Sequence, residues 1–247
     1  MYRTSYEPAQ NYSPADLMIC VMARLIHDKE TVFHGVSSHM PMIAVLLAKQ
    51  LHAPDAVHLN IPGGVNPEDL KIQDVSSANG ALCVDCECIF PLQDVFDFSM
   101  RGRLDVAFLS GIQFDVHGNV NASVIGNYNR PKVRMPGGAG SAVLIPTAKR
   151  AILWRTKHDS RTFVEKVDFV TTRGNIDRII TPLCVFKFEQ GRLKLETVHP
   201  FVTFETVQEN TSFELSREGV QTTLPPSVDE MRVLHLIDPD NCRNIEF

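Results

Sequence analysis

Residues 111–141 carry the glycines and amide side chains of this sequence that are best suited to chemistry. The segment follows an apolar run, residues 104–109, that predicts a strand, and it ends in the sequence GGAG. Bare backbone N–H groups at a strand end can donate hydrogen bonds to a carbonyl oxyanion or to a phosphate. The alternative is a surface loop built from turn-forming residues. The candidate donors are Gly137, Gly138, Ala139 and Gly140, and the candidate binding amides are Gln113 and Asn121.

Two further segments, residues 35–39 and 60–66, also follow predicted strands and carry small or polar residues. An imidazole in the first of them is a candidate general acid or base, and the two serines beside it either cap the next helix or contact a substrate. In parallel sheets, ligands bind outside the carboxyl ends of the strands, so the three segments form one site if their strands are neighbours. The candidates here are Ser37, Ser38, His39, Asn60, Ile61 and Gly63.

The spacing of apolar residues predicts alternating strands and helices. Strands are expected over residues 30–34, 57–61, 104–109, 151–155 and 168–171, followed by a hairpin of 183–188 and 192–197. Helices are expected over residues 14–26, 42–51, 92–100, 141–147, 203–209 and 228–236, with Ser13 and Ser227 as N-caps. This order predicts an α/β fold with an open, mostly parallel sheet, helices on both faces, and a small antiparallel β extension near the C-terminus. We expect a single domain over residues 1–247, in which 1–12 form a polar N-terminal arm.

Composition argues against several classes of partner. The 24 basic and 29 acidic residues give a formal charge of −5, and the basic residues are scattered, so neither nucleic acid nor an anionic membrane surface is an expected partner. The apolar runs are far shorter than the ~20 residues that cross a bilayer. The N-terminal residues lack the apolar stretch of a secretory signal, so we expect a cytoplasmic protein. No G-x-G-x-x-G motif links a strand to a helix, which argues against a nicotinamide enzyme.

Three of the six cysteines, Cys83, Cys86 and Cys88, are spaced as C-x-x-C-x-C. A closed zinc site needs four nitrogen or sulfur ligands, and no second cysteine pair follows. We therefore expect reduced thiols and no bound metal.

A set of ordered motifs resembles a known family. The first four are APD at 53–55, CECIFP at 86–91, QxDxxGNxN at 113–121 and PGGAG at 136–140; further along are FVEKVD at 163–168, LxVF at 183–186, HP at 199–200 and IDP at 237–239. Together they make the chain similar to the β subunit of the glutaconate CoA-transferase family, in the class I CoA-transferase superfamily. The resemblance implies an α/β enzyme subunit that acts on an acyl-CoA thioester with a separate α-type subunit, usually as α2β2. Coenzyme A then enters as part of the substrate, and no permanently bound cofactor is expected.

One position departs from the family. Members that transfer CoA carry a nucleophilic glutamate after the APD turn, and counting from that turn places it at Ile61, which cannot attack a thioester. The nearest carboxylates after this position are Glu68 and Asp69. The resemblance therefore favours the family's hydrolase or lyase members, with the carboxylate supplied by the α subunit and the GGAG segment lining the thioester. The alternatives are a true CoA-transferase subunit that uses Glu68, Asp69 or the partner, and a non-catalytic scaffold or binding subunit.

Overall fold

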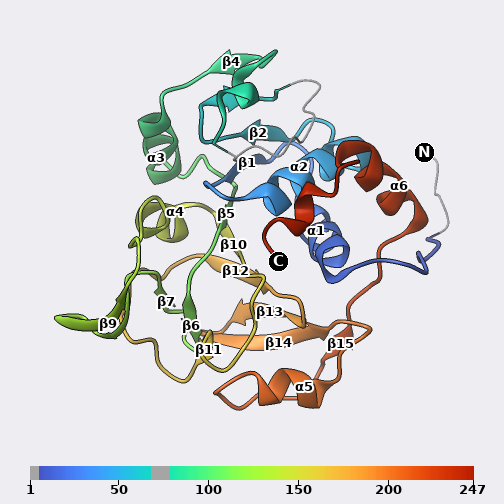
Figure 1. The fold of residues 1–247 in the computed structure, drawn as a ribbon. Helices are drawn as coiled ribbons and strands as arrows, with labels where there is room; N and C mark the ends of the chain where they lie inside the picture. The colour runs from blue at the N-terminus through green and yellow to red at the C-terminus, as the bar shows by residue number, and fades with distance from the viewer. Residues whose placement is uncertain (1–5, 68–77) are drawn as a thin grey trace.

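A computed structural model describes residues 6–67 and 78–247 of the protein. Its main sheet has ten strands in the order β15-β14-β13-β12-β10-β5-β1-β2-β3-β4 (Figure 1). The five central strands, from β12 to β2, are parallel, and antiparallel pairs extend both sides. The bounds are β1 (Thr31–His34), β2 (Val57–Leu59), β3 (Gly64–Val65), β4 (Cys88–Ile89), β5 (Val106–Leu109), β10 (Arg150–Trp154), β12 (Ile176–Ile180), β13 (Cys184–Glu189), β14 (Arg192–Val198) and β15 (Gln221–Thr222).

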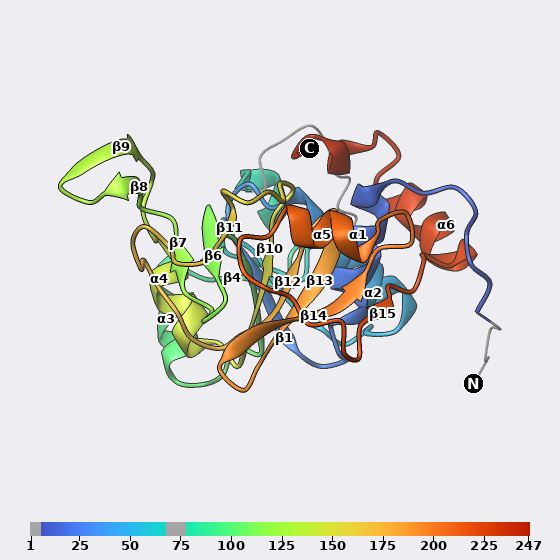
Figure 2. The same ribbon diagram turned by 90° about the horizontal axis from the view of Figure 1, so that it is seen from below.

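Helices cover both faces of this sheet, as expected (Figures 1 and 2). One apolar cluster joins the sheet to α1 (Pro14–Arg24), α2 (His39–Leu51) and α6 (Val228–Ile237). A second cluster on the opposite face includes side chains from α3 (Leu92–Met100), α4 (Ser141–Thr147) and α5 (Phe204–Glu209). Neighbouring residues of β1 point to opposite faces, with Val32 in the first cluster and Phe33 in the second. The central strands are therefore buried on both sides, which is why they read as continuous apolar runs. Two short 3₁₀ helices are η1 (Gly80–Cys83) and η2 (Cys242–Asn244).

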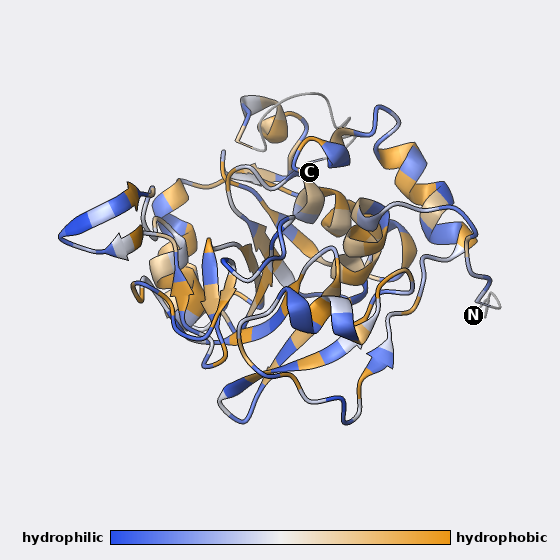
Figure 3. Ribbon diagram, turned by 60° about the horizontal axis from the view of Figure 1, so that its bottom comes forward, coloured by the Kyte–Doolittle hydropathy of each residue, from blue (hydrophilic) through white to orange (hydrophobic). Residues whose placement is uncertain are grey.

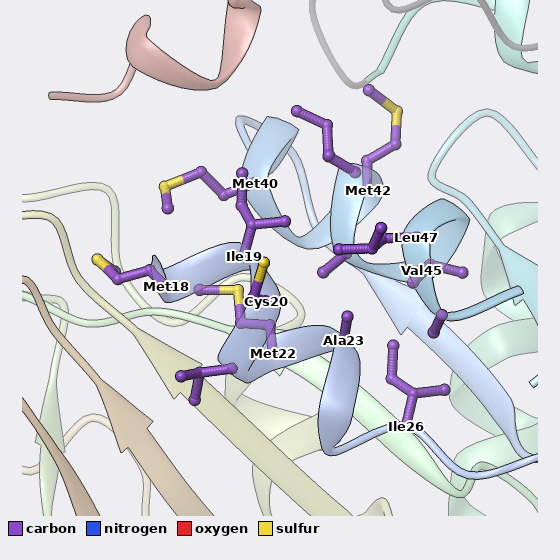
Figure 4. Close-up of a cluster of buried hydrophobic side chains, with 14 of the residues drawn as sticks. Met18, Ile19, Cys20, Met22, Ala23, Ile26, Met40, Met42, Val45 and Leu47 are labelled. Atoms are coloured by element: carbon purple, nitrogen blue, oxygen red, sulfur yellow. The ribbon is translucent and has the colours of Figure 1, made fainter. Parts of the chain in front are cut away.

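The first helix illustrates how the sequence determines local structure. The Ser13 hydroxyl accepts a hydrogen bond from the Asp16 N–H, and the Asp16 carboxylate accepts one from the Ser13 N–H, so the two residues form a capping box. Apolar side chains of α1 then pack against those of α2 in the core, where Met18, Met22 and Met40 are fully buried (Figure 4). No helix in the described ranges has both the length and the apolar character needed to cross a membrane.

Three sequence-based expectations were wrong. Residues 111–141 are more than a loop, because they contain β6 (Gln113–Asp115), β7 (Val120–Asn121), β8 (Val124–Asn127) and β9 (Arg130–Arg134). β6 and β7 form a small sheet with β11 (Phe163–Val164), and β8 and β9 form a separate hairpin. Residues 168–171 do not extend the main sheet; they lie against the small sheet, where the Thr171 N–H donates to the Val120 carbonyl, and β12 takes the expected place. α2 begins at His39, three residues earlier than predicted.

Candidate functional site

The three candidate segments leave the same edge of the main sheet. β1 pairs in parallel with β2 on one side and with β5 on the other, so that Phe33 lies opposite both Leu59 and Ala107. Parallel neighbours end at one edge, and residues 35–39, 60–66 and the segment after β5 all emerge there. The strand order therefore starts the three segments at one edge of the sheet, and that they form one site stays a prediction.

The glycine loop, Gly137 to Gly140, lies between β9 and α4. The Gly137 N–H donates to the Ala122 carbonyl at 2.9 Å, so this donor is already used. The N–H groups of Gly138, Ala139 and Gly140 have no acceptor within the part of the chain that the structure describes. These three remain available as oxyanion donors, and the fourth expected donor serves the fold instead.

Backbone geometry explains why small residues occupy this loop. Gly137 has φ +94° and Ala139 has φ +40°, both in the left-handed region that disfavours large side chains. A Cβ atom at Gly138 would lie 2.9 Å from both the Ala142 Cβ and the Thr171 Cγ2. Gly140 has an ordinary helical φ of −61°, and a Cβ there would meet its neighbours at normal contact distances. Gly140 is therefore the one glycine of the loop at which a side chain can be added without strain.

The two candidate amides, Gln113 and Asn121, bind each other across β6 and β7. The Asn121 Nδ2 donates to the Gln113 Oε1 at 2.7 Å and to the Val124 carbonyl at 2.6 Å. The Asn121 Oδ1 accepts from the Ser123 and Val124 N–H groups. Gln113 also binds Asp168 through its Oε1 and its Nε2. These bonds use all of the hydrogen-bonding capacity of Asn121, so its geometry supports positioning of the loop, and contact with a substrate stays a prediction for both amides.

The imidazole of His39 lies at the start of α2 and is buried. The Glu246 carboxylate, near the C-terminus, accepts a hydrogen bond from the His39 N–H at 3.0 Å, and its Oε1 lies 3.5 Å from the His39 Nδ1. Glu246 therefore places a negative charge at the N-terminal end of α2, where the helix dipole favours it. Sequence reasoning did not find this residue, because no local pattern links position 246 to position 39.

The two serines before His39 do not cap α2 through their side chains. Ser38 occupies the N-cap position, and its hydroxyl donates to the Val36 carbonyl at 3.0 Å. Ser37 is exposed and has φ +47°, an uncommon conformation for a residue other than glycine. The expected capping hydrogen bond is therefore absent from both serines, and their contact with a substrate remains a prediction.

A pair of histidines that the sequence analysis missed lies beneath these residues. His34 on β1 and His58 on β2 are both buried, and their Nε2 atoms are 2.9 Å apart. Burial lowers the pKa of His34 to about 4, and it lowers the pKa of His58 well below the ordinary value, with the His34 charge acting in the same direction. Both rings are therefore neutral near pH 7. In the sheet, His58 lies opposite Val32, two residues before His34 on β1. The available signal in the sequence was one histidine on each of two consecutive predicted strands.

The segment after β2 forms a closed turn. The Asn60 Oδ1 accepts from the Gly63 and Gly64 N–H groups at 3.2 and 2.9 Å, and its Nδ2 donates to the Leu82 carbonyl. Gly63 has φ +101°, and a Cβ there would lie 2.1 Å from the Phe90 carbonyl oxygen. Ile61 is partly buried against the second apolar cluster. Asn60 and Gly63 thus shape the turn that presents Ile61, and substrate binding by all three stays a prediction.

Glu68 and Asp69, the nearest alternative carboxylates, lie outside the described residues. All six cysteines are free thiols, and no group of three or more metal-ligating side chains occurs in the described ranges. The Cys86 thiol donates to the Cys83 carbonyl, so the C-x-x-C-x-C spacing here serves a turn.

The site residues form two groups at one edge of the sheet. The first comprises the segments after β1 and β2, and the second comprises the small sheet, the β8–β9 hairpin and the glycine loop. β5, which leads into the second group, lies directly beside β1 in the main sheet, so the two groups begin at the same edge.

Comparison with known proteins agrees with this architecture. A family model described as coenzyme A transferase matches residues 17–210. The chain is 31% identical to the B-type subunit of the 3-oxoadipate CoA-transferase of Pseudomonas knackmussii, covering 92% of this chain and 94% of that protein. It is 30% identical to the cholesterol ring-cleaving hydrolase IpdB subunit of Rhodococcus jostii, covering 84% and 85%. The crystal structure of the decarboxylase AibA/AibB matches with a TM-score of 0.90 at 28% identity, covering 96% of this chain and 99% of that chain. The chain belongs to the coenzyme A transferase family.

Proposed function

We propose that this chain is the B-type subunit of a two-subunit enzyme that cleaves an acyl-CoA as a hydrolase or lyase. The observation that carries the proposal is that isoleucine, at position 61, stands where the family's transferases have their nucleophilic glutamate. Its side chain has no nucleophilic atom and packs against the apolar cluster under the sheet edge. A covalent enzyme–CoA intermediate therefore has no carboxylate to form on at this position.

The glycine loop supplies the electrostatic part of the reaction. In hydrolysis, the oxygen of water bonds to the acyl carbon, the C–S bond breaks, and the proton released from water goes to the CoA thiolate. The carbonyl oxygen becomes an oxyanion on the way, and the N–H groups of Gly138, Ala139 and Gly140 are the donors that stabilise it. The carboxylate that activates the water comes from the partner subunit. Two of the relatives, IpdB and the 3-oxoadipate CoA-transferase chain, are named as subunits, which supports such a partner.

A second candidate function is CoA transfer between carboxylic acids. The 31% identity to a CoA-transferase subunit favours it, and Glu68, Asp69 or a partner carboxylate would then be the nucleophile. The two functions differ in one measurable way, because only transfer passes through CoA bound covalently to the enzyme.

The test combines this chain with its α-type partner and a panel of dicarboxylic and cyclic-keto acyl-CoA substrates. Consumption of each acyl-CoA and release of free CoA thiol are followed without any acceptor acid, and enzyme-bound CoA ester is trapped with borohydride or hydroxylamine. We expect turnover without a trapped adduct, with thiol release from a thioester hydrolase and an acyl-CoA product of changed mass from a lyase. Adduct formation, or turnover only with an acceptor acid, would assign the chain to the transferases. Absence of turnover from every complex that assembles would make it a non-catalytic subunit.

A matched pair of variants tests the role of position 61 itself. Ile61→Glu returns a carboxylate to this position and is expected to yield a trapped CoA adduct. Ile61→Gln has nearly the same shape without the nucleophile and is expected to yield none. Equal trapping in both variants, or none from a correctly assembled Ile61→Glu complex, would show that position 61 does not face the thioester.

A further inference from the structure

The β8–β9 hairpin projects from the body of the protein beside the glycine loop (Figure 2). Two backbone hydrogen bonds tie its base to that loop: the Met135 N–H donates to the Ser123 carbonyl, and the Gly137 N–H donates to the Ala122 carbonyl, both at 2.9 Å. The Ser123 hydroxyl and the Ala122 N–H also bind the Thr171 hydroxyl. The hairpin and the candidate oxyanion donors are therefore parts of one continuous piece of backbone.

This hairpin carries three exposed cations, Arg130, Lys132 and Arg134. None of them forms an ion pair with a carboxylate in the described ranges, whereas seven of the twelve other arginines there do. Residues 116–158 contain no aspartate or glutamate at all, in a chain whose formal charge is −5. The outer part of the hairpin is hydrophilic (Figure 3). The Asp168 carboxylate accepts a hydrogen bond from the Gly126 N–H of β8, so the hairpin carries three cations beside one carboxylate and has an excess of positive charge on an otherwise acidic protein.

Local contacts hold one of these cations in place. The Arg134 Nη2 donates to the Tyr128 carbonyl at 3.0 Å, and its guanidinium lies 4.8 Å from the centre of the Tyr128 ring. Tyr128 in turn stacks on Phe169, with 4.6 Å between the ring centres. One donor of the guanidinium is used in this way, and the rest of the planar fork suits bidentate recognition of a phosphate.

We propose that Arg130, Lys132 and Arg134 bind the phosphate groups of coenzyme A while the thioester lies against Gly138–Gly140. The inference rests on the proposed function, because it assigns the nucleotide end of the same substrate. Coenzyme A carries its phosphates at the far end of a long, flexible arm from the thioester. An extended chain spans ~3.4 Å per residue, which places Arg134 within about 10 Å of Gly137 and Arg130 within about 24 Å. The cations therefore follow a path that leads away from the oxyanion donors.

The test compares two substrates in the assembled complex: an acyl-CoA, and the acyl-pantetheine thioester that lacks every phosphate. The variant Arg130→Ala/Lys132→Ala/Arg134→Ala is expected to raise KM for acyl-CoA at least tenfold, because three charge-assisted contacts with the phosphates are lost. It is expected to leave kcat and the KM for acyl-pantetheine unchanged. Arg232→Ala, an exposed arginine on α6 at the far side of the molecule, is the matched control and should alter neither KM.

Two further measurements sharpen the assignment. The KM of the wild type for acyl-CoA should rise with ionic strength more steeply than that of the triple variant. 3′-Dephospho-CoA thioesters separate the two kinds of phosphate. If the triple substitution raises their KM less than it raises the KM for acyl-CoA, part of the contact is with the 3′-phosphate. If it raises both KM values equally, the contact is with the pyrophosphate. Arg134→Lys keeps the charge but loses the fork, and should show an intermediate KM.

The outcomes separate this inference from the function on which it rests. If the wild-type complex turns over no acyl-CoA, the proposed function fails. If it cleaves acyl-CoA and the triple variant keeps the wild-type KM, the hairpin does not bind phosphates. Loss of co-elution with the α-type partner in the triple variant would instead make the hairpin a contact for an acidic surface of that subunit, which also overturns the inference.

Discussion

The imidazoles of His34 and His58 meet across two adjacent parallel strands, with 2.9 Å between their Nε2 atoms. One ring must donate and the other accept, and burial keeps both rings neutral near pH 7, so they adopt complementary tautomers. The His34 Nδ1 lies 3.3 Å from the Gly35 carbonyl, which makes it the donor of its ring and makes the His34 Nε2 the acceptor. His58 then donates, and its own Nδ1 is a buried acceptor without a partner in the described part of the protein. A proton added to the His58 Nδ1 would leave this hydrogen bond intact, but burial of both rings disfavours the added charge.

The first prediction is therefore a loss of stability in acid. The pKa of His34 is about 4 in the folded protein and 6.5 as its ordinary value, so the stabilisation from the neutral ring is complete above pH 6.5 and is lost as the pH falls towards 4. The loss from this group is on the order of 3 kcal/mol. Burial lowers the pKa of His58, His158 and His199 as well, so their losses add to it. Urea unfolding at pH 8, 6.5, 5 and 4 measures the effect.

Two variants serve as references for this pH series. His34→Gln/His58→Gln removes the buried pair and should flatten part of the decline. His235→Gln changes an exposed ring on α6 and should reproduce the wild-type curve. A free energy of unfolding that stays constant from pH 8 to pH 4 would contradict neutral burial of these histidines.

The second prediction concerns the anchor of the C-terminal segment. Arg243 is buried and donates from its Nε to the Asp16 Oδ1 at 2.5 Å and from its Nη1 to the Asp238 Oδ2 at 2.8 Å. Arg243→Ala leaves two buried carboxylates without their cation and should lower the free energy of unfolding by about 3–5 kcal/mol. Arg217→Ala breaks an exposed pair with Glu205 and should cost less than about 1 kcal/mol. Chemical unfolding compares the two variants, and equal effects would mean that the buried network contributes little.

The third prediction tests the oxyanion donors with a matched pair at Gly140. Gly140→Pro removes this N–H, while the φ of −61° suits proline. Gly140→Ala keeps the N–H, and its Cβ would lie no closer than 3.5 Å to neighbouring atoms. The loss of one oxyanion donor typically lowers kcat 10²–10³-fold, so we expect a fall of about that size for Gly140→Pro and wild-type turnover for Gly140→Ala.

Proline at position 140 also restricts Ala139, so thermal unfolding and assembly with the partner are measured for both variants. Full activity in a folded Gly140→Pro complex would remove this N–H from the reaction. Gly138 is a poorer test, because any Cβ there clashes with Ala142 and Thr171.

The fourth prediction separates two roles of Glu246. Its carboxylate accepts a hydrogen bond from the His39 N–H, the first N–H of α2. Glu246→Gln removes the negative charge at this helix end and should lower the free energy of unfolding by about 1 kcal/mol. Loss of a negative charge 3.5 Å from the imidazole also disfavours its protonated form. If His39 transfers protons in the reaction, the imidazole limb of the kcat–pH profile should move to lower pH.

The exposed Glu214 provides the control, since Glu214→Gln should change neither stability nor the profile. A lower stability with an unmoved profile would make Glu246 a helix cap only and would exclude His39 from proton transfer. An unchanged stability would contradict the capping contact itself.

Local sequence patterns determined much of the secondary structure. The helices over 92–100 and 141–147 have the predicted bounds, and Ser13 and Ser227 are the N-caps that were expected. The antiparallel hairpin of β13 and β14 turns at Gln190 and Gly191, both with positive φ. These features depend on residues within a few positions of one another, which is why the chain itself encodes them.

Only the tertiary structure decided how these elements form a site. It placed β1 between β2 and β5, folded the amide-rich segment into four strands, two of which the bond between Gln113 and Asn121 joins, and brought Glu246 to His39. Each of these depends on contacts between distant parts of the chain, where packing and long-range hydrogen bonds outweigh local preference. The sequence therefore determined which groups were present and which elements carry them, while strand order and the docking of the C-terminal segment determined which of those groups meet.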